Sequence, residues 1–507
     1  MPQLKVSKEA LAELTERIQK VYLDDKIPWV VGYSGGKDST ATLELLWYAI
    51  RELPEEQRKH KTVHVISTDT LVESPVVAQW VNESLRLMRD AAKDQDMPIE
   101  VHRLTPEPKH SYWTNLIGRG YPAPRQGFRW CTNRLKIQPS NQFIMDVVKN
   151  YGEAIMVLGT RKAESATRSA NMTHHEKHRM RQWLSPNASL PNSLVFTPIE
   201  DWSNDDVWMY LMQKPNPWDR SNKDLLTMYR GASADNECPL VVDTTTPSCG
   251  NSRFGCWVCT LVAADKSMEA MIHNDDEKRW MKPLLDLRNE IANAGPDGKI
   301  NDFDRRDFRR MDKSVKFFKD AERANRPIHG PYTKKWREHW LRKLLQIERL
   351  LQEHGPKDDT QLQLITLGEI REIRRIWVED KHEFDDAVPR IYLEVTGKEY
   401  PYLDDLPRRP FGPAEWDMLK EICGNDNNLL LELQTSMLDI EQQNRGLILR
   451  RGIVDELEKT IHGCYYSSVE DAVSFHQRLK QLKAEAEQLH LPFDEEEGMD
   501  SDDLPSD

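Results

Sequence analysis

The six residues SGGKDS, at positions 34–39, combine two glycines, a lysine and an aspartate in one short stretch. Glycines let backbone N–H groups turn toward an anion, and a helix that starts directly afterwards adds the positive end of its dipole. Lys37 is long enough to reach a phosphate oxygen. The Walker pattern has four residues between its first glycine and its Gly-Lys pair, so this shorter stretch is a different kind of loop. It predicts a phosphate-binding loop, with an ordinary turn as the alternative.

Four of the chain's seven cysteines lie within 22 residues, in the sequence CPLVVDTTTPSCGNSRFGCWVC. They are Cys238, Cys249, Cys256 and Cys259. So few cysteines, spread so unevenly, favour a metal site over a disulfide framework. Zinc and iron–sulfur clusters both accept four thiolates. Zinc ribbons usually show two close pairs, whereas this sequence has one CxxC pair and two separate cysteines, which favours a 4Fe–4S cluster.

Cys131 lies upstream in GFRWCTNRLK, close to Arg129, Arg134 and Lys136. Neighbouring cations lower the pKa of a thiol and favour the thiolate, which can carry a sulfur atom as a persulfide. The sequence therefore makes Cys131 a candidate sulfur carrier. The alternative is a fifth cysteine near the metal site, as a ligand or a spare. Cys423 and Cys464 are expected to be packed thiols.

Apolar strands and amphipathic helices alternate along the first part of the chain. The expected strands are 29–33, 61–70, 99–106 and 153–160, and the expected helices are 1–26, a segment from Ser39, 74–94, 133–150 and 203–213. This alternation predicts an α/β fold with a parallel sheet and helices on both faces. Ligands of such sheets bind at the carboxyl ends of the strands, so residues 34–39, Asp69 and 159–161 should converge. Residues 107–130 and the HHEKH stretch at 174–178 are predicted to be loops.

The composition suggests five regions along the 507 residues. They are an α/β domain (1–213), a cysteine-rich iron–sulfur segment (214–265), a charged helical region (266–395), a C-terminal helical region (396–493) and a disordered acidic tail (494–507). The tail is assigned from its eight acidic residues and its lack of any basic residue.

The net charge of −13 argues against a wholly basic nucleic-acid-binding protein. The charge is uneven, however, because residues 301–350 hold fifteen basic and eight acidic side chains, and residues 119–139 hold five basic and none acidic. These segments could bind a polyanion, or they could be solvated helix faces. No apolar run has the length of a membrane span, and the first residues lack the apolar core of a signal peptide, so a cytoplasmic location without membrane contact is expected.

The order of several motifs resembles a known superfamily. The motifs are SGGKDS (34–39), STDT (67–70), FRWCTNRLKIQP (128–139), VLGTRKAESATR (157–168) and TPIEDWSNDDVWMYL (197–211). They resemble phosphoadenylyl-sulfate reductase-like proteins and, among these, the DndC family, the ATP-pyrophosphatase/sulfurtransferase component of bacterial DNA phosphorothioation. The resemblance covers roughly residues 25–265. The assimilatory reductases differ, because they end in a cysteine motif followed by histidine, and their iron–sulfur forms have an adjacent cysteine pair where this chain has Cys131 and Thr132.

The resemblance implies an adenine nucleotide alpha hydrolase-like fold and an enzyme that uses ATP, Mg²⁺ and a 4Fe–4S cluster. Its reaction would adenylate a DNA backbone phosphate and help to replace a non-bridging oxygen with sulfur. The implied partners are DNA, a cysteine desulfurase as sulfur donor, and other Dnd proteins, including an ATPase and a small DNA-binding subunit.

The resemblance also implies roles for individual residues. Lys37, Asp38 and Cys131 would be catalytic, and Cys238, Cys249, Cys256 and Cys259 would bind the cluster. Glu164 would be a structural partner of the loop arginines. The nucleotide would be bound by Ser34, Gly35, Gly36, Lys37, Asp38, Ser39, Asp69, Arg161 and Arg168.

Three other functions use a similar loop or cluster. A tRNA-thiolation enzyme would modify a base, and a phosphoadenylyl-sulfate reductase-like enzyme would act on a small nucleotide. An iron–sulfur scaffold that docks an ATPase partner would have no chemistry of its own, but the intact SGGKDS loop argues against it.

Overall fold

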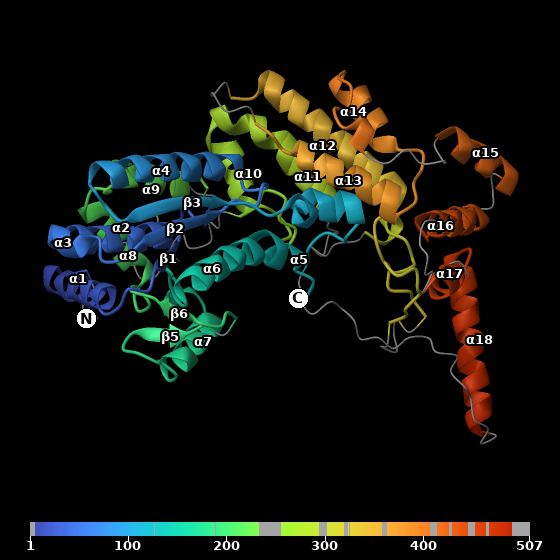
Figure 1. The fold of residues 1–507 in the computed structure, drawn as a ribbon. Helices are drawn as coiled ribbons and strands as arrows, with labels where there is room; N and C mark the ends of the chain where they lie inside the picture. Colours follow the sequence, from blue (N-terminus) through green and yellow to red (C-terminus); the bar gives the residue numbers. More distant parts are fainter. Residues whose placement is uncertain are drawn as a thin grey trace. The chain divides into compact units, whose positions relative to one another are not determined.

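The computed structural model describes residues 6–125, 127–187, 189–232, 255–293, 302–318, 323, 325–356, 362–405, 413–424, 428–444, 452–462 and 466–488 (Figure 1). The predicted ligands Cys238 and Cys249, together with Cys464 and the acidic tail, lie outside these residues. The chain divides into two compact units. The first comprises Met1–Tyr112 and Pro124–Ile291, and the second comprises Trp113–Ala123 and Ala292–Asp507.

In the described part of the first unit, six strands form one sheet in the order β3-β2-β1-β4-β6-β5. The strands are β1 (Trp29–Gly32), β2 (Val63–Thr68), β3 (Ile99–Leu104), β4 (Ala154–Val157), β5 (Leu184–Pro186) and β6 (Ser193–Phe196). The β1 pairings with β2 and β4, and those of β2 with β3 and β4 with β6, are parallel. The predicted parallel sheet is therefore confirmed for most of its strands.

The edge strand β5 differs from this prediction because it pairs antiparallel with β6, which makes the sheet mixed. Neither strand was expected from the sequence. β5 has three residues and ends in Pro186, which suits an edge position because proline cannot donate a ladder hydrogen bond. Such a short strand has no usable alternation of apolar and polar residues.

Helices cover both faces of the sheet, as predicted. Trp29 and Val31 point to one face and pack with apolar residues of α1 (Lys8–Leu23), α2 (Lys37–Arg51), α4 (Pro75–Asp94) and α8 (Asn204–Gln213). Val30 points to the opposite face, where it packs with Ile144 and Val147 of α6 (Gln138–Tyr151). This alternation follows from the two-residue period of a strand, and apolar residues on both faces allow β1 to lie in the middle of the sheet.

Local signals in the sequence explain where these helices begin. Pro75 occupies the first turn of α4. The N–H groups of a first turn have no partner within the helix, so the missing N–H of proline costs no hydrogen bond there. In α8, Ser203 accepts from the N–H of Asp206, whose carboxylate accepts from the N–H of Ser203, which is a capping box.

The remaining helices of the first unit include α3 (Glu55–Arg58), α5 (Trp130–Thr132), α7 (Ala166–Glu176), α9 (Asn222–Gly231), α10 (Lys266–Asn274) and α11 (Lys282–Ala292). The loop prediction for HHEKH is partly wrong, because His174 and His175 belong to α7. Ser165 caps this helix by accepting from the N–H of Arg168, a local signal that the apolar pattern does not contain.

The described part of the second unit is mostly helical, as the C-terminal sequence predicts. The helical prediction is wrong for 302–333, whose described residues contain one short helix, η6 (Phe303–Arg305), with turns and isolated bridges. The other helices of this unit include η2 (Thr114–Arg119), α12 (Lys334–His354), α13 (Leu367–Arg375), η7 (Ile376–Asp380), α14 (Ala387–Thr396), α15 (Pro413–Cys423), α16 (Asn428–Asn444), α17 (Ile453–His462) and α18 (Val469–Gln488). None of the described helices in the chain combines the length and the apolar character that a membrane span requires.

The loop prediction for residues 107–130 is wrong at η2. The Trp113 indole donates to the Leu364 carbonyl at 2.8 Å, and the Trp377 indole donates to the Ile117 carbonyl at 3.0 Å. These bonds join η2 to segments about 250 residues later in the chain, so long-range packing rather than local propensity stabilises it.

Candidate active site

A cavity of about 920 Å³ lies at the carboxyl ends of β1, β2 and β4. Its volume is within the range of roughly 300–1,000 Å³ that is usual for small-molecule sites. The cavity is lined by every residue from Ser34 to Ser39 and by Asp69, Arg161 and Arg168. The structure therefore brings together all the predicted nucleotide-binding residues, which a parallel sheet places at one edge.

The SGGKDS loop adopts a backbone conformation that requires glycine. Gly35 has a φ of +74°, and a Cβ atom at this position would lie 2.5 Å from Cγ2 of Val81. The Trp80 indole donates to the Gly35 carbonyl at 3.1 Å and fixes the turn. Because α2 begins at Lys37, its positive N-terminal turn lines the cavity. The loop is thus shaped to bind an anion.

A second glycine, Gly159, lets the chain after β4 approach helix α2. A Cβ atom there would lie 2.7 Å from the carbonyl oxygen of Asp38 and 2.8 Å from the hydroxyl of Thr42. Any side chain would separate the two elements. The close approach places Arg161 beside the first turn of α2.

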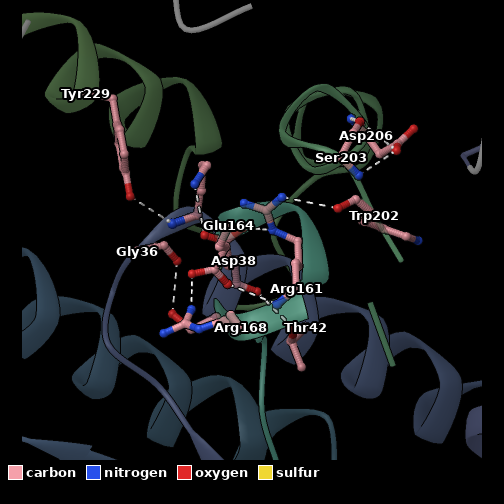
Figure 2. Close-up of polar contacts among 12 residues, drawn as sticks. Gly36, Asp38, Thr42, Arg161, Glu164, Arg168, Trp202, Ser203, Asp206 and Tyr229 are labelled. Carbon is pink, nitrogen blue, oxygen red and sulfur yellow. Dashed lines mark hydrogen bonds and ion pairs between the residues drawn. The ribbon is translucent and has the colours of Figure 1, made fainter. Parts of the chain in front are cut away.

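Asp38 lies between two cations, Lys37 and Arg161, and Figure 2 shows its contact with Arg161. Its Oδ2 atom is 2.9 Å from Nζ of Lys37, and its Oδ1 atom accepts from Nε of Arg161 at 2.6 Å. Arg161 is 4% exposed and also donates to the Trp202 carbonyl at 3.2 Å. Arg161 thus holds Asp38 in place, and its predicted contact with phosphate stays a prediction.

Arg168 and Glu164 form an ion pair at the rim of the cavity (Figure 2). Glu164 also accepts from the Arg161 N–H at 2.9 Å, so it links the two predicted arginines as a structural partner. The side chain of Arg168 is 44% exposed and lines the cavity, and its predicted contact with phosphate stays a prediction.

Tyr229 of α9 is a cavity residue that the sequence analysis missed. Its hydroxyl accepts from the Lys37 N–H at 3.3 Å, and burial raises its pKa well above the ordinary value, so the phenol stays neutral. It lies 192 residues from Lys37 in a segment without a recognisable motif. Arg103 was also missed, although its ion pair with Asp69 joins residues at the ends of neighbouring strands, where a partner could have been sought.

Cys256 is connected to the cavity through Glu73. The Cys256 sulfur lies 3.3 Å from the Thr70 hydroxyl, and that hydroxyl donates to Glu73 at 3.0 Å. Glu73 is also 3.4 Å from Nζ of Lys136, and both Glu73 and Lys136 line the cavity. A thiol-bearing segment therefore lies beside the predicted nucleotide site.

The predicted effect of neighbouring cations on Cys131 is wrong. Burial raises the pKa of this thiol, and the nearby Cys259 raises it further. Arg134 contacts Nδ1 of His110 at 3.3 Å, and Lys136 contacts Glu73 while it also acts electrostatically on Cys131. Burial of the Cys131 thiol therefore outweighs the effect of the cations that lie near it in the sequence.

The described cysteines of the CxxC pair suit a metal–thiolate site. Cys259 donates its N–H to the Cys256 carbonyl at 3.0 Å in a tight turn. Burial raises the pKa of Cys256 to about 12, so the free thiol is protonated at neutral pH, whereas a bound metal stabilises the thiolate. Cys256 and Cys259 thus fit two ligands of a cluster.

Residues 28–261 match the family model of the phosphoadenosine phosphosulfate reductase domain. This match supports the assignment of that segment to the phosphoadenosine phosphosulfate reductase-like superfamily. An uncharacterized protein of Methanocaldococcus jannaschii is 28% identical over 204 residues, which is 40% of this chain and 35% of that protein. The chain thus spans about a third of that relative's length.

Two solved structures show weaker similarity. FMN adenylyltransferase of Candida glabrata, in complex with FMN and an ATP analog, has a TM-score of 0.26 at 11% identity over 46% of this chain and 64% of that one. The U34-tRNA thiolase of Methanococcus maripaludis with its 4Fe–4S cluster has a TM-score of 0.25 at 11% identity, over 56% and 80%. Scores this low carry no argument about this chain.

Proposed function

We propose that this protein is an ATP pyrophosphatase that adenylates a DNA backbone phosphate and helps to replace one non-bridging oxygen with sulfur. The observation that supports this most strongly is the anion-binding SGGKDS loop in a cavity beside the Cys256 segment. The match to the phosphoadenosine phosphosulfate reductase domain supports sulfur chemistry, and the order of the motifs supports the adenylating reaction. DNA as the substrate comes from the resemblance to the DndC family.

In the first step, a DNA phosphate oxygen attacks the α-phosphorus of ATP. The bond between that phosphorus and the bridging oxygen to the β-phosphate breaks, and pyrophosphate leaves. Lys37 and the N-terminus of α2 stabilise the charge that develops on pyrophosphate. Arg161 pairs with Asp38 and fixes the orientation of its carboxylate. Asp38, Asp69 and Glu73 line the cavity and offer the carboxylate oxygens that suit Mg²⁺.

In the second step, a persulfide attacks the activated phosphorus and AMP leaves. Cys131 is the proposed carrier of the persulfide. The raised pKa of its thiol disfavours the thiolate, but a persulfide ionises more readily than a thiol and can still act as the nucleophile. A second thiolate then attacks the carrier sulfur, which forms a disulfide and releases the DNA phosphorothioate. A dithiol reductant returns the disulfide to thiols.

The proposed 4Fe–4S cluster would be held by Cys256 and Cys259 together with Cys238 and Cys249. When bound, such a cluster, with one cysteine on each iron, would supply electron transfer. In this proposal residues 1–213 bind the nucleotide, residues 214–265 hold the cluster, and residues 266–395 and 396–493 serve substrate or partner binding. The proposed partners are a cysteine desulfurase and other Dnd proteins, in the cytoplasm.

Mass spectrometry of nuclease-digested host DNA tests the substrate. We expect phosphorothioate dinucleotides in cells that carry the intact gene, and their loss after deletion or after complementation with Lys37→Ala. Complementation with Lys162→Ala, a change in the exposed ion pairs next to Arg161, should restore them. Unchanged DNA together with lost tRNA thionucleosides would overturn the proposal in favour of tRNA thiolation.

The family match also favours a second candidate, a reductase acting on phosphoadenylyl sulfate. Such an enzyme would release sulfite from that nucleotide without ATP. Sulfite production by purified protein in the presence of a dithiol reductant would support this candidate, and its absence alongside ATP-dependent pyrophosphate release would exclude it.

A further inference from the structure

Two histidines and a glutamate from neighbouring strands meet on the sheet face that α6 covers. His64 of β2 is the register partner of Glu100 in β3, and His102 lies two residues further along the same face. Among the described residues, these three form the one group of at least three His, Cys, Asp or Glu ligand atoms that lie within 4.8 Å of one another. The group does not line the nucleotide cavity.

The three ligand atoms form a nearly equilateral triangle. Nδ1 of His64 is 3.2 Å from Nε2 of His102 and 3.3 Å from Oε2 of Glu100, and the third side is 3.6 Å. Zinc bonds to nitrogen and oxygen of about 2.0–2.2 Å at tetrahedral angles separate neighbouring ligands by about 3.3–3.6 Å. The triangle therefore has the size of three corners of a tetrahedral zinc site, whose fourth ligand would be a water molecule.

The surroundings allow both histidines to act as neutral ligands. Phe143 of α6 contacts both rings, with centroid distances of 5.6 Å to His64 and 4.8 Å to His102. A neutral imidazole offers a lone pair to a metal ion. The exposed fraction of the side chains rises from 9% for His64 to 31% for His102 and 59% for Glu100, which gives an ion a path from solvent.

We propose that His64, Glu100 and His102 bind a divalent transition-metal ion, with Zn²⁺ as the preferred occupant. Two imidazoles select zinc over Mg²⁺ and Ca²⁺, which prefer oxygen ligands. Since β3 is an edge strand of the sheet, an ion held by ligands from β2 and β3 would fasten that edge to the strand beside it. The proposed role is structural, and it does not depend on the proposed DNA chemistry.

Zinc binding to the full-length protein, with its native cofactors, tests this site. The protein is dialysed against a weak chelator, one equivalent of Zn²⁺ is added, and the bound metal is measured by elemental analysis and X-ray absorption. We expect about one zinc per chain, with nitrogen and oxygen neighbours at about 2.0–2.1 Å and no sulfur at about 2.3 Å. Zinc should also raise the melting temperature.

Glu100→Gln and His102→Gln each remove one ligand while keeping a polar side chain of similar shape. Both should weaken zinc binding by more than about tenfold and abolish the rise in melting temperature, while the metal-free variants melt near the wild type. His174→Asn is the matched control, because His174 and His178 of the α7 region are a second histidine pair, with rings 4.6 Å apart, and it should leave binding unchanged. Equal zinc content in wild type and both glutamine variants, a sulfur-only shell, or no retained zinc would overturn the proposal.

Discussion

Nε of Arg161 donates to Oδ1 of Asp38 at 2.6 Å and joins the end of β4 to the first turn of α2 (Figure 2). An unpaired carboxylate in a phosphate-binding loop would repel the ligand, whereas the charge of Asp38 is balanced by Arg161 and Lys37 together. This ion pair is the contact through which two distant parts of the sequence shape one anion site.

Arg161→Met should therefore expose bound phosphate to the charge of Asp38. We expect ATP-dependent pyrophosphate release to fall by about 100-fold or more, the usual effect of losing a positioned charge. Lys162→Met is the matched control, because that cation pairs with Glu176 and Asp201 outside the cavity, and it should change the rate by less than about threefold. Equal effects of the two changes would mean that the ion pair has no special role.

Gly35→Ala should destroy the anion loop, because the new Cβ would meet Val81 in a left-handed backbone conformation. Gly152→Ala separates the effect of backbone strain from the effect of the steric clash. Its φ of +86° is similar, but a Cβ there would meet no atom within 4 Å beyond its own chain neighbours. Both variants should lose about 1–2 kcal/mol of stability from backbone strain. Only Gly35→Ala should lose ATP binding, as measured by calorimetry, and normal binding by this variant would refute the loop assignment.

Cysteine replacements distinguish a cluster ligand from a sulfur carrier. Cys256→Ser should lower the iron content of anaerobically purified protein, whereas Cys131→Ser should keep the iron and lose sulfur transfer. Cys423→Ser, in α15 of the second unit, should affect neither. Loss of iron in Cys131→Ser would show that Cys131 is a ligand and would contradict its role as carrier.

The raised pKa of Cys256 predicts how the stability of the metal-free protein depends on pH. The folded value of about 12 lies above the ordinary value of 9.0, so the folded state favours the protonated thiol. This preference for the protonated Cys256 thiol stabilises the folded state fully below pH 9, and the stabilisation is lost as the pH rises toward 12. Urea unfolding at pH 8 and pH 10 should show a smaller decline for Cys256→Ser than for the wild type. Equal declines would indicate that this thiol is not desolvated.

Much of the fold was predictable because β1, β2 and α2 carry strong periodic patterns, and the rule that ligands bind at strand ends placed residues 34–39, Asp69 and Arg161 together. Other features depend on distant packing. Tyr229 reaches Lys37 from 192 residues away, and η2 depends on bonds to Leu364 and Trp377.

Strand register explains a further failure of prediction. His64 and His102 each stand in a strand whose sequence contains no metal-binding motif, and only the pairing of β2 with β3 brings them together with Glu100. Similarly, burial of Cys131 outweighs the cations near it in the sequence, so a count of neighbouring charges gave the wrong direction for its pKa.

The products formed from ATP labelled on the α- and γ-phosphates test the central claim most directly. With DNA and Mg²⁺ present, the wild type should release labelled pyrophosphate and yield AMP, and Lys37→Ala should release neither. Formation of ADP and inorganic phosphate, or pyrophosphate release that survives Lys37→Ala, would contradict cleavage between the α- and β-phosphates at this loop.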